Sequence, residues 1–212
     1  MATAWLAGGS GLVGGTLLQR LLQDDYFDKV ISAGRRTLPV QDPKLVQVVT
    51  DFRSAPAFDA LDAPAIAFCC LGTTIKQAGS REAFRAVDHD AVLAFAQGAK
   101  RKGAHAFVHV TALGARPGSR VFYNSVKGET ERDVALVGFP SVYALRPSIL
   151  DGERAESRPG EGMGLIIGRA LAPLLGKYRP TPVMTVAKTM IAVAKTAAPG
   201  AHVIEPDKMI GE

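Results

Sequence analysis

Seven short apolar runs recur along the chain and constrain its fold more than any other feature. Each run spans four to seven residues without polar alternation, which is typical of strands buried on both faces of a sheet. Between them, apolar residues recur at helical spacing, as in Leu17 with Leu21 and Phe84 with Val87. Strands that alternate with helices predict an α/β fold, a doubly wound parallel sheet of about seven strands with helices on both faces. The runs cover residues 3–7, 29–33, 45–49, 65–70, 104–110, 141–145 and 201–204.

The length of 212 residues predicts one domain over the whole chain, because a globule of this size can bury enough surface to fold alone. The alternation lapses between residues 151 and 182, where glycines and prolines surround one apolar segment at residues 163–175. We interpret residues 151–182 as an elaboration of the same domain on its substrate side.

A glycine-rich turn follows the first apolar run. Residues 8–14 read Gly-Gly-Ser-Gly-Leu-Val-Gly, so glycines at 8, 11 and 14 form a GxxGxxG pattern between a predicted strand and a predicted helix. Such glycines allow a tight turn, the approach of a pyrophosphate to the backbone and close packing of helix and sheet. The context predicts a Rossmann-like dinucleotide-binding domain, with helix amides facing the phosphates. The predicted contacts are Gly8, Ser10, Gly11, Leu12, Val13 and Gly14.

The second apolar run leads into Gly34-Arg35-Arg36. A domain specific for NAD carries a carboxylate near this point, about 20 residues beyond the glycines, to bind the ribose hydroxyls. Guanidinium groups instead pair with a 2′-phosphate, so the sequence favours NADP(H) over NAD(H). We expect Arg35 to bind the phosphate and Arg36 to lie against the adenine ring. The alternative is that both arginines are simply solvated.

Two further segments follow strands at the same predicted edge of the sheet. Asp51 and Phe52 come after the third run, where such folds contact adenine. Leu71, Gly72 and Thr73 come after the fourth run, where such folds pass the middle of the cofactor. We predict both segments as cofactor contacts from their position rather than from their residue types.

Tyr123 and Lys127 follow the fifth run at the start of the next predicted helix, and Thr111 ends that run. The i,i+4 spacing puts the phenol and the ammonium on one helix face. A nearby cation favours the phenolate, so Tyr123 could exchange a proton with a substrate oxygen while hydride moves at a nicotinamide. Lys127 could also hold the nicotinamide ribose, and the Thr111 hydroxyl could hydrogen-bond the substrate oxygen. The alternative is a helix-start tyrosine with a solvated lysine.

Further strings along the chain are FCCLGTT at 68–74, GRR at 34–36, VKGE at 126–129, RP at 146–147 and ESRPGE at 156–161. With the motifs above, they resemble the short-chain dehydrogenase/reductase superfamily. The closer resemblance is to its atypical branch, the Tat-interacting-protein oxidoreductases known from animals, with bacterial relatives, and it covers nearly the whole chain. The resemblance implies a single Rossmann-like domain, NADPH binding and a catalytic pair that matches Tyr123 and Lys127.

Two positions bear on how far this resemblance extends. Many members of the family carry two hydroxyl residues at the end of the fifth strand, whereas Thr111 is followed here by Ala112. Asp88 falls near the position where the superfamily has a helix asparagine that supports the lysine. The resemblance leaves open whether Thr111 replaces the missing hydroxyl and whether Asp88 replaces the asparagine or is merely solvated.

The main hypothesis is an NADPH-dependent oxidoreductase that transfers hydride to or from a small carbonyl or alcohol, with Ser148 in the lining of the substrate pocket. A second hypothesis is a regulatory protein whose NADP(H) occupancy changes its binding to a protein partner, since animal members of the family are discussed as regulators. A third is a nucleotide-sugar epimerase or dehydratase, which normally has a longer C-terminal region and prefers NAD. The substrate and the oligomeric state stay open.

Composition argues against several other classes of protein. The net charge of +5 is spread along the chain, whereas nucleic-acid binding needs a concentrated basic patch. No apolar run reaches the roughly 20 residues of a membrane helix. The only cysteines, Cys69 and Cys70, are adjacent and unsuited to a disulfide with each other, which predicts a reducing, cytoplasmic location.

The histidines do not predict a metal site. His105 and His109 have i,i+4 spacing, but they belong to a predicted strand, where they stand about 13 Å apart and cannot share one metal ion. His89 and His202 are isolated in the sequence, and we expect them to be structural.

Overall fold

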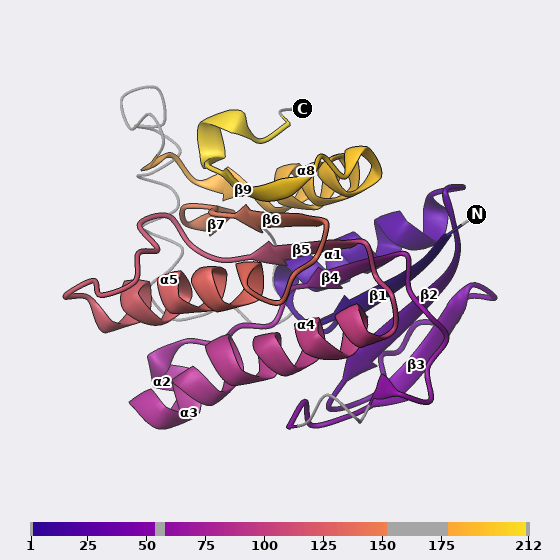
Figure 1. The fold of residues 1–212 in the computed structure, drawn as a ribbon, viewed down its shortest axis with the longest axis horizontal. Helices are drawn as coiled ribbons and strands as arrows, with labels where there is room; N and C mark the ends of the chain where they lie inside the picture. Colours follow the sequence, from indigo (N-terminus) through magenta and orange to yellow (C-terminus); the bar gives the residue numbers. More distant parts are fainter. Residues whose placement is uncertain (1, 54–57, 152–177, 211–212) are drawn as a thin grey trace.

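The computed structural model describes residues 2–53, 58–151 and 178–210. Within these residues, seven strands form one sheet in the order β3-β2-β1-β4-β5-β6-β9, and every neighbouring pair is parallel (Figure 1). The predicted Rossmann-like α/β fold is therefore confirmed. The strands are β1 (Ala2–Ala7), β2 (Phe27–Gly34), β3 (Leu45–Val49), β4 (Ile66–Cys69), β5 (Ala106–Val110), β6 (Ser141–Leu145) and β9 (Gly200–Ile204).

Helices cover both faces of this sheet (Figure 1). Helices α1 (Leu12–Gln23) and α8 (Val183–Thr196) pack on one face, and α4 (Ala91–Arg101) and α5 (Phe122–Ala135) pack on the other. The shorter elements are α2 (Ile75–Ala78), α3 (Arg81–Arg85), the π-helical turn η2 (Ala86–Asp90), β7 (Leu150–Asp151), β8 (Thr181–Pro182) and η4 (Pro206–Lys208).

Two apolar cores sandwich the sheet. Side chains along a strand alternate between its faces, so Leu6 of β1 joins the core under α1 and α8. Its neighbour Trp5 points the other way, where its ring lies 5.8 Å from that of Phe58 and 6.1 Å from that of Phe95 on α4. Because both faces are covered, the central strands are mostly apolar, which is the pattern seen in the sequence.

One predicted helix is interrupted. The helical spacing around Phe84 and Val87 continues to Phe95, but the structure divides this segment into α3, the π-helical turn η2 and α4. Both Asp88 and His89 of the turn are buried. A π-helical turn carries one extra residue per hydrogen-bonded ring and is frequently found at functional sites.

The strand order reverses between β1 and β4. From β1 the chain moves outward to β2 and β3, and then returns to the other side of β1 at β4. In open α/β sheets, ligands bind outside the carboxyl ends of the strands where the order reverses in this way. The glycine turn after β1 and the segment 70–73 after β4 both lie at this point.

Most of residues 151–182, including the apolar segment 163–175 and the string at 156–161, lies outside the described residues. At its ends, β7 pairs with β8 in a small parallel sheet. In the part of the chain that the structure describes, no helix has the length and apolar character needed to cross a membrane.

Candidate functional site

The glycine turn after β1 packs tightly against the backbone that follows β4. Gly8 has a φ of +85°, and a Cβ there would lie 2.6 Å from the carbonyl carbon of Cys70. A Cβ at Gly14 would lie 2.1 Å from the carbonyl oxygen of Gly8. Since Cβ atoms do not approach other atoms this closely, both positions need glycine. Positions 8 and 14 of the glycine pattern therefore have the steric basis expected of a dinucleotide-binding turn.

The start of α1 offers backbone N–H groups to an anion. Gly11 is the N-cap residue, and among the described residues no side chain caps this helix end. The first turn contains no acidic residue, so the amides of Leu12 and Val13 lie at the positive end of the helix dipole without a competing carboxylate. These residues fit the pyrophosphate of a dinucleotide.

A pocket of about 310 Å³ lies beside the glycine turn. Ser10 lines it from the turn, and Arg36, Thr37 and Leu38 line it from the segment after β2. Arg35 and Arg36 are both exposed, but of these two arginines only Arg36 lines the pocket. A guanidinium beside a hydroxyl and a helix start suits a phosphate group. The geometry therefore favours Arg36 for the phosphate, whereas the sequence alone favours Arg35.

The segment after β3 directs its two predicted contact residues differently. Phe52 has a φ of +58° and is buried, with its ring 6.0 Å from Phe58 and 6.1 Å from Phe95. The side chain of Phe52 therefore faces the core, and the cofactor contact expected of this segment from its position stays a prediction. Asp51 stays exposed at the sheet edge and pairs with Arg53 at 3.2 Å.

Tyr123 and Lys127 lie together on α5, as their spacing predicts. The Lys127 Nζ lies 6.0 Å from the centroid of the Tyr123 ring and 2.7 Å from Asp88 Oδ1. The other oxygen of Asp88 accepts a hydrogen bond from the backbone N–H of Thr73 at 2.8 Å. A Cβ at Gly72 would lie 3.4 Å from Asp88 Oδ1 and 3.6 Å from Lys127 Nζ. One carboxylate thus joins the lysine to the segment after β4.

Burial and nearby charges have opposite effects on the pKa of Lys127. Burial lowers its pKa, but the attraction of Asp88 and Tyr123 outweighs burial, so the pKa lies above its ordinary value. Burial raises the pKa of Cys69 to about 12. Burial and the charge of Lys127 lower the pKa of His109 to about 3. At neutral pH the lysine is therefore an ammonium, balanced by one carboxylate and surrounded by neutral groups.

Thr111 is held by structural hydrogen bonds. Its hydroxyl donates to Glu131 Oε1 at 2.5 Å and to the carbonyl oxygen of Leu145 at 3.3 Å. Glu131 also accepts two hydrogen bonds from Arg146, at 3.0 and 2.5 Å. The single hydroxyl proton of Thr111 is engaged in these contacts and is not free for a substrate oxygen. Thr111 joins β5 to α5 and β6, and the geometry does not support the catalytic role predicted for it.

Ser148 makes hydrogen bonds that join two segments of the structure, and its predicted place in the substrate pocket stays a prediction. Its hydroxyl donates to the carbonyl oxygen of Arg179, and its backbone N–H donates to Thr181 Oγ1 at 3.2 Å. These bonds tie the segment after β6 to β8.

The sequence did not predict Thr37 and Leu38 as pocket residues. Their position directly after the arginine pair was the only signal that could have identified them.

The chain is 36% identical over 196 residues to the protein HTATIP2 of Rattus norvegicus, covering 89% of this chain and 79% of that protein. It is 32% identical over 224 residues to the protein FMP52 of Coccidioides immitis, covering 98% and 90%. The chain belongs to the family of HTATIP2 and FMP52. The predicted kinship with the atypical short-chain dehydrogenases/reductases is confirmed at this level. These relatives come from an animal and a fungus, so they give no support to the bacterial part of the resemblance. No family model matches the chain.

The fold of this HTATIP2/FMP52-family chain is shared with larger enzymes. The solved structure of WbmH from Bordetella bronchiseptica in complex with NAD+ matches with a TM-score of 0.73 and 16% identity, over 100% of this chain and 77% of that one. At such low identity the match shows the fold alone. That fold is the Rossmann-like α/β fold with a parallel sheet.

The predicted cytoplasmic location is contradicted by the names of the fungal members of this HTATIP2/FMP52 family. FMP52 of Coccidioides immitis and FMP52 of Saccharomyces cerevisiae are both named mitochondrial proteins. The prediction relied on Cys69 and Cys70, which are free thiols in the structure. Free thiols indicate a reducing environment, but they do not distinguish one reducing compartment from another.

Proposed function

We propose that this protein is an NADP(H)-dependent oxidoreductase acting on a small carbonyl or alcohol substrate. The observation that carries the proposal is the arrangement of Tyr123, Lys127 and Asp88 at the carboxyl edge of the sheet, next to the glycine turn. The NAD+ in the WbmH structure supports a nicotinamide dinucleotide as the class of cofactor. When bound, such a cofactor donates or accepts the hydride.

The residues of the chain divide the remaining work. The glycine turn and the first amides of α1 would hold the pyrophosphate. Lys127 has three N–H donors, and those not directed at Asp88 would bind the ribose hydroxyls. In a reduction, the phenol of Tyr123 gives its proton to the developing alkoxide of the substrate, and the ammonium of Lys127 stabilises the phenolate that remains. Thr111 has no chemical step and fixes β5 against α5.

The preference for NADP(H) rests on the pocket beside the glycine turn. Arg36 and Ser10 line this pocket together, and we assign the 2′-phosphate to them. Calorimetry with NADPH and NADH tests the assignment. Arg36→Ser should weaken NADPH binding roughly tenfold or more and leave NADH binding nearly unchanged, because one charge-assisted hydrogen bond is lost. Arg35→Ser is the matched control, and a selective loss there instead would return the phosphate to Arg35.

Turnover tests the reaction itself. Wild-type protein is assayed with NADPH and a panel of aldehydes, ketones and quinones. Tyr123→Phe should lower the rate on any accepted substrate by roughly 100-fold or more, the usual contribution of a general acid. Tyr26→Phe, which changes an exposed tyrosine, is the control. Full activity of Tyr123→Phe at every pH would refute the assigned mechanism.

A second candidate is an NADP(H)-binding regulatory protein with little catalysis. One observation favours it: the hydroxyl of Thr111 is engaged by Glu131, and Ala112 next to it has none. Neither strand-end residue therefore offers a free hydroxyl to polarise a substrate oxygen. Tight NADPH binding without turnover on the whole panel would favour this candidate over the oxidoreductase.

A further inference from the structure

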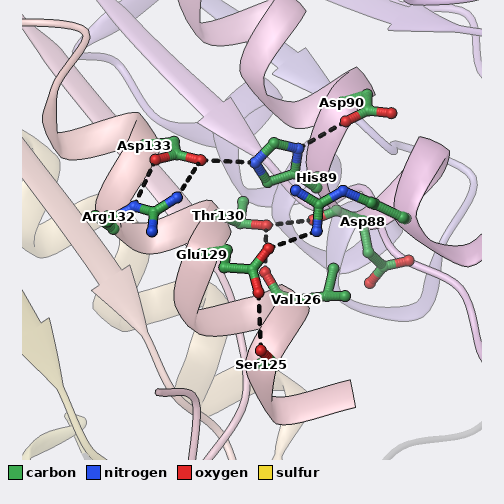
Figure 2. A network of polar contacts seen from close by, with 10 residues as sticks. Asp88, His89, Asp90, Ser125, Val126, Glu129, Thr130, Arg132 and Asp133 are labelled. Carbon is green, nitrogen blue, oxygen red and sulfur yellow. Dashed lines mark hydrogen bonds and ion pairs between the residues drawn. The ribbon is translucent and has the colours of Figure 1, made fainter. Parts of the chain in front are cut away.

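His89, in the π-helical turn η2, has a carboxylate at each ring nitrogen (Figure 2). Its Nδ1 lies 2.7 Å from Asp90 Oδ1, and its Nε2 lies 2.9 Å from Asp133 Oδ2 on α5. The side chain of His89 is only 9% exposed. The contact with Asp133 joins elements far apart in the chain, so His89 cross-links η2 to α5.

Hydrogen-bond chemistry sets the protonation state of this ring. An ionised carboxylate only accepts hydrogen bonds, whereas a neutral imidazole has one donor and one acceptor nitrogen. Asp133 is ionised, because hydrogen bonds from Arg132 and then from His89 outweigh its partial burial and lower its pKa to about 2. Both contacts of His89 are hydrogen bonds only if both ring nitrogens carry hydrogen. The two contacts therefore favour a ring that carries hydrogen on both nitrogens.

The charges around the ring balance in this form. Glu129 on α5 interacts electrostatically with His89, and Arg85 of α3 pairs with Glu129 at 2.5 Å. Arg132 forms an ion pair with Asp133, its neighbour on α5. With the two aspartates, this cluster contains three carboxylates and two guanidinium groups. The imidazolium makes it neutral, whereas a neutral ring leaves one excess negative charge and turns a nitrogen lone pair toward a carboxylate oxygen.

The turn that carries His89 also carries Asp88. Thr130 on α5 donates its hydroxyl to the backbone carbonyl oxygen of Asp88 at 2.8 Å (Figure 2). The turn is thus tied to α5 through a backbone contact and through the ring of His89. We propose that His89, as an imidazolium, is a positioning residue that braces η2 against α5 and so keeps Asp88 in place beside Lys127. The positioning role rests on the proposed cofactor site; the charged state of the ring rests on its own contacts.

Two measurements on the full chain test this proposal. Long-range nitrogen–proton NMR shows whether both ring nitrogens of His89 carry hydrogen at about pH 7, with His89→Gln used to assign its signals. Calorimetry of NADPH binding from about pH 6 to about pH 9 compares wild type with His89→Gln. Glutamine can still donate to Asp133 but carries no charge. The other titrating groups, including those of NADPH, are common to both proteins, so the ratio of their dissociation constants isolates His89. The control is His105→Gln, which changes the histidine directly before β5.

We expect imidazolium signals from His89 at neutral pH. Wild type should bind NADPH roughly fivefold more tightly than His89→Gln at low pH, the effect of about one hydrogen bond, and this advantage should vanish as the imidazolium loses its proton. A neutral ring overturns the charged state. An affinity ratio of one at every pH, even with reduced stability, makes His89 a structural cross-link only and overturns the positioning role. If wild type binds no NADPH, the proposed function fails and the positioning role fails with it, while the NMR result still decides the state of the ring.

Discussion

Asp88 Oδ1 lies 2.7 Å from Lys127 Nζ, and the two side chains are 0% and 7% exposed. Removing one partner of such a pair leaves a buried charge without compensation, at a cost of about 3–5 kcal/mol. We therefore expect Asp88→Asn and Lys127→Met each to lower the free energy of unfolding by about 3 kcal/mol or more. The double variant should lose clearly less than the sum, because no uncompensated charge remains. Urea denaturation gives the free energy of unfolding of wild type, the two single variants and the double variant. Strictly additive losses in the single variants and the double variant would contradict a coupled pair.

Two adjacent glycines of α1 provide a matched test of the phosphate-binding turn. A Cβ at Gly14 would lie 2.1 Å from the Gly8 carbonyl oxygen, whereas a Cβ at Gly15 would lie 3.5 Å from the Gly9 carbonyl oxygen, an ordinary contact. Gly14→Ala should destabilise the fold by about 1–3 kcal/mol and abolish measurable NADPH binding. Gly15→Ala should gain up to about 1 kcal/mol of stability from helix propensity and, because Gly15 also lines the pocket, should weaken NADPH binding far less than Gly14→Ala does. Calorimetry and urea denaturation give both quantities, and equal behaviour of the two variants would be inconsistent with this packing.

The contacts of Thr111 predict a structural phenotype for its replacement. Thr111→Val removes the hydrogen bond to Glu131 and leaves the pair of Glu131 with Arg146 in place. We expect a loss of about 1–3 kcal/mol in the free energy of unfolding and a turnover rate close to wild type once the variant is folded. A roughly 100-fold fall in rate with unchanged stability would instead restore the catalytic role that the sequence predicts.

The burial of His109 predicts that the folded protein loses stability in acid. Neither of its ring nitrogens has a hydrogen-bond partner among the described residues, and burial together with the Lys127 charge lowers its pKa to about 3. The unfolded chain takes up a proton at the ordinary histidine pKa of about 6.5, so stability is intact above that pH and falls at lower pH, by up to about 1.4 kcal/mol per unit, until about pH 3. His109→Leu should remove this component and keep or increase stability at neutral pH, because no hydrogen bond is lost. Urea midpoints of wild type and His109→Leu at about pH 7 and about pH 4 measure how much stability each protein loses in acid. An equal loss in both proteins would contradict the role of His109 in acid sensitivity.

Local rules account for the features that the sequence predicts correctly. Burial on both faces requires apolar runs, and those runs mark the strands of the sheet with errors of only a few residues at their ends. Steric limits on a turn require glycine at positions 8 and 14. Helical periodicity alone places Tyr123 and Lys127 on one face of α5. Each of these follows from residues close together in the chain.

The amino-acid sequence by itself determined the layered fold, the glycine turn and the pairing of a phenol with an ammonium. Only the tertiary structure decided that Phe52 faces the core, that Glu131 engages Thr111, that Arg36 rather than Arg35 lines the pocket, and that His89 bridges two aspartates. For the contacts of Thr111 with Glu131 and of His89 with Asp133, the physical reason is distance along the chain. A hydrogen bond or ion pair between residues 20 or 44 positions apart exists only after the sheet and its helices have packed, and no local pattern of residues specifies it.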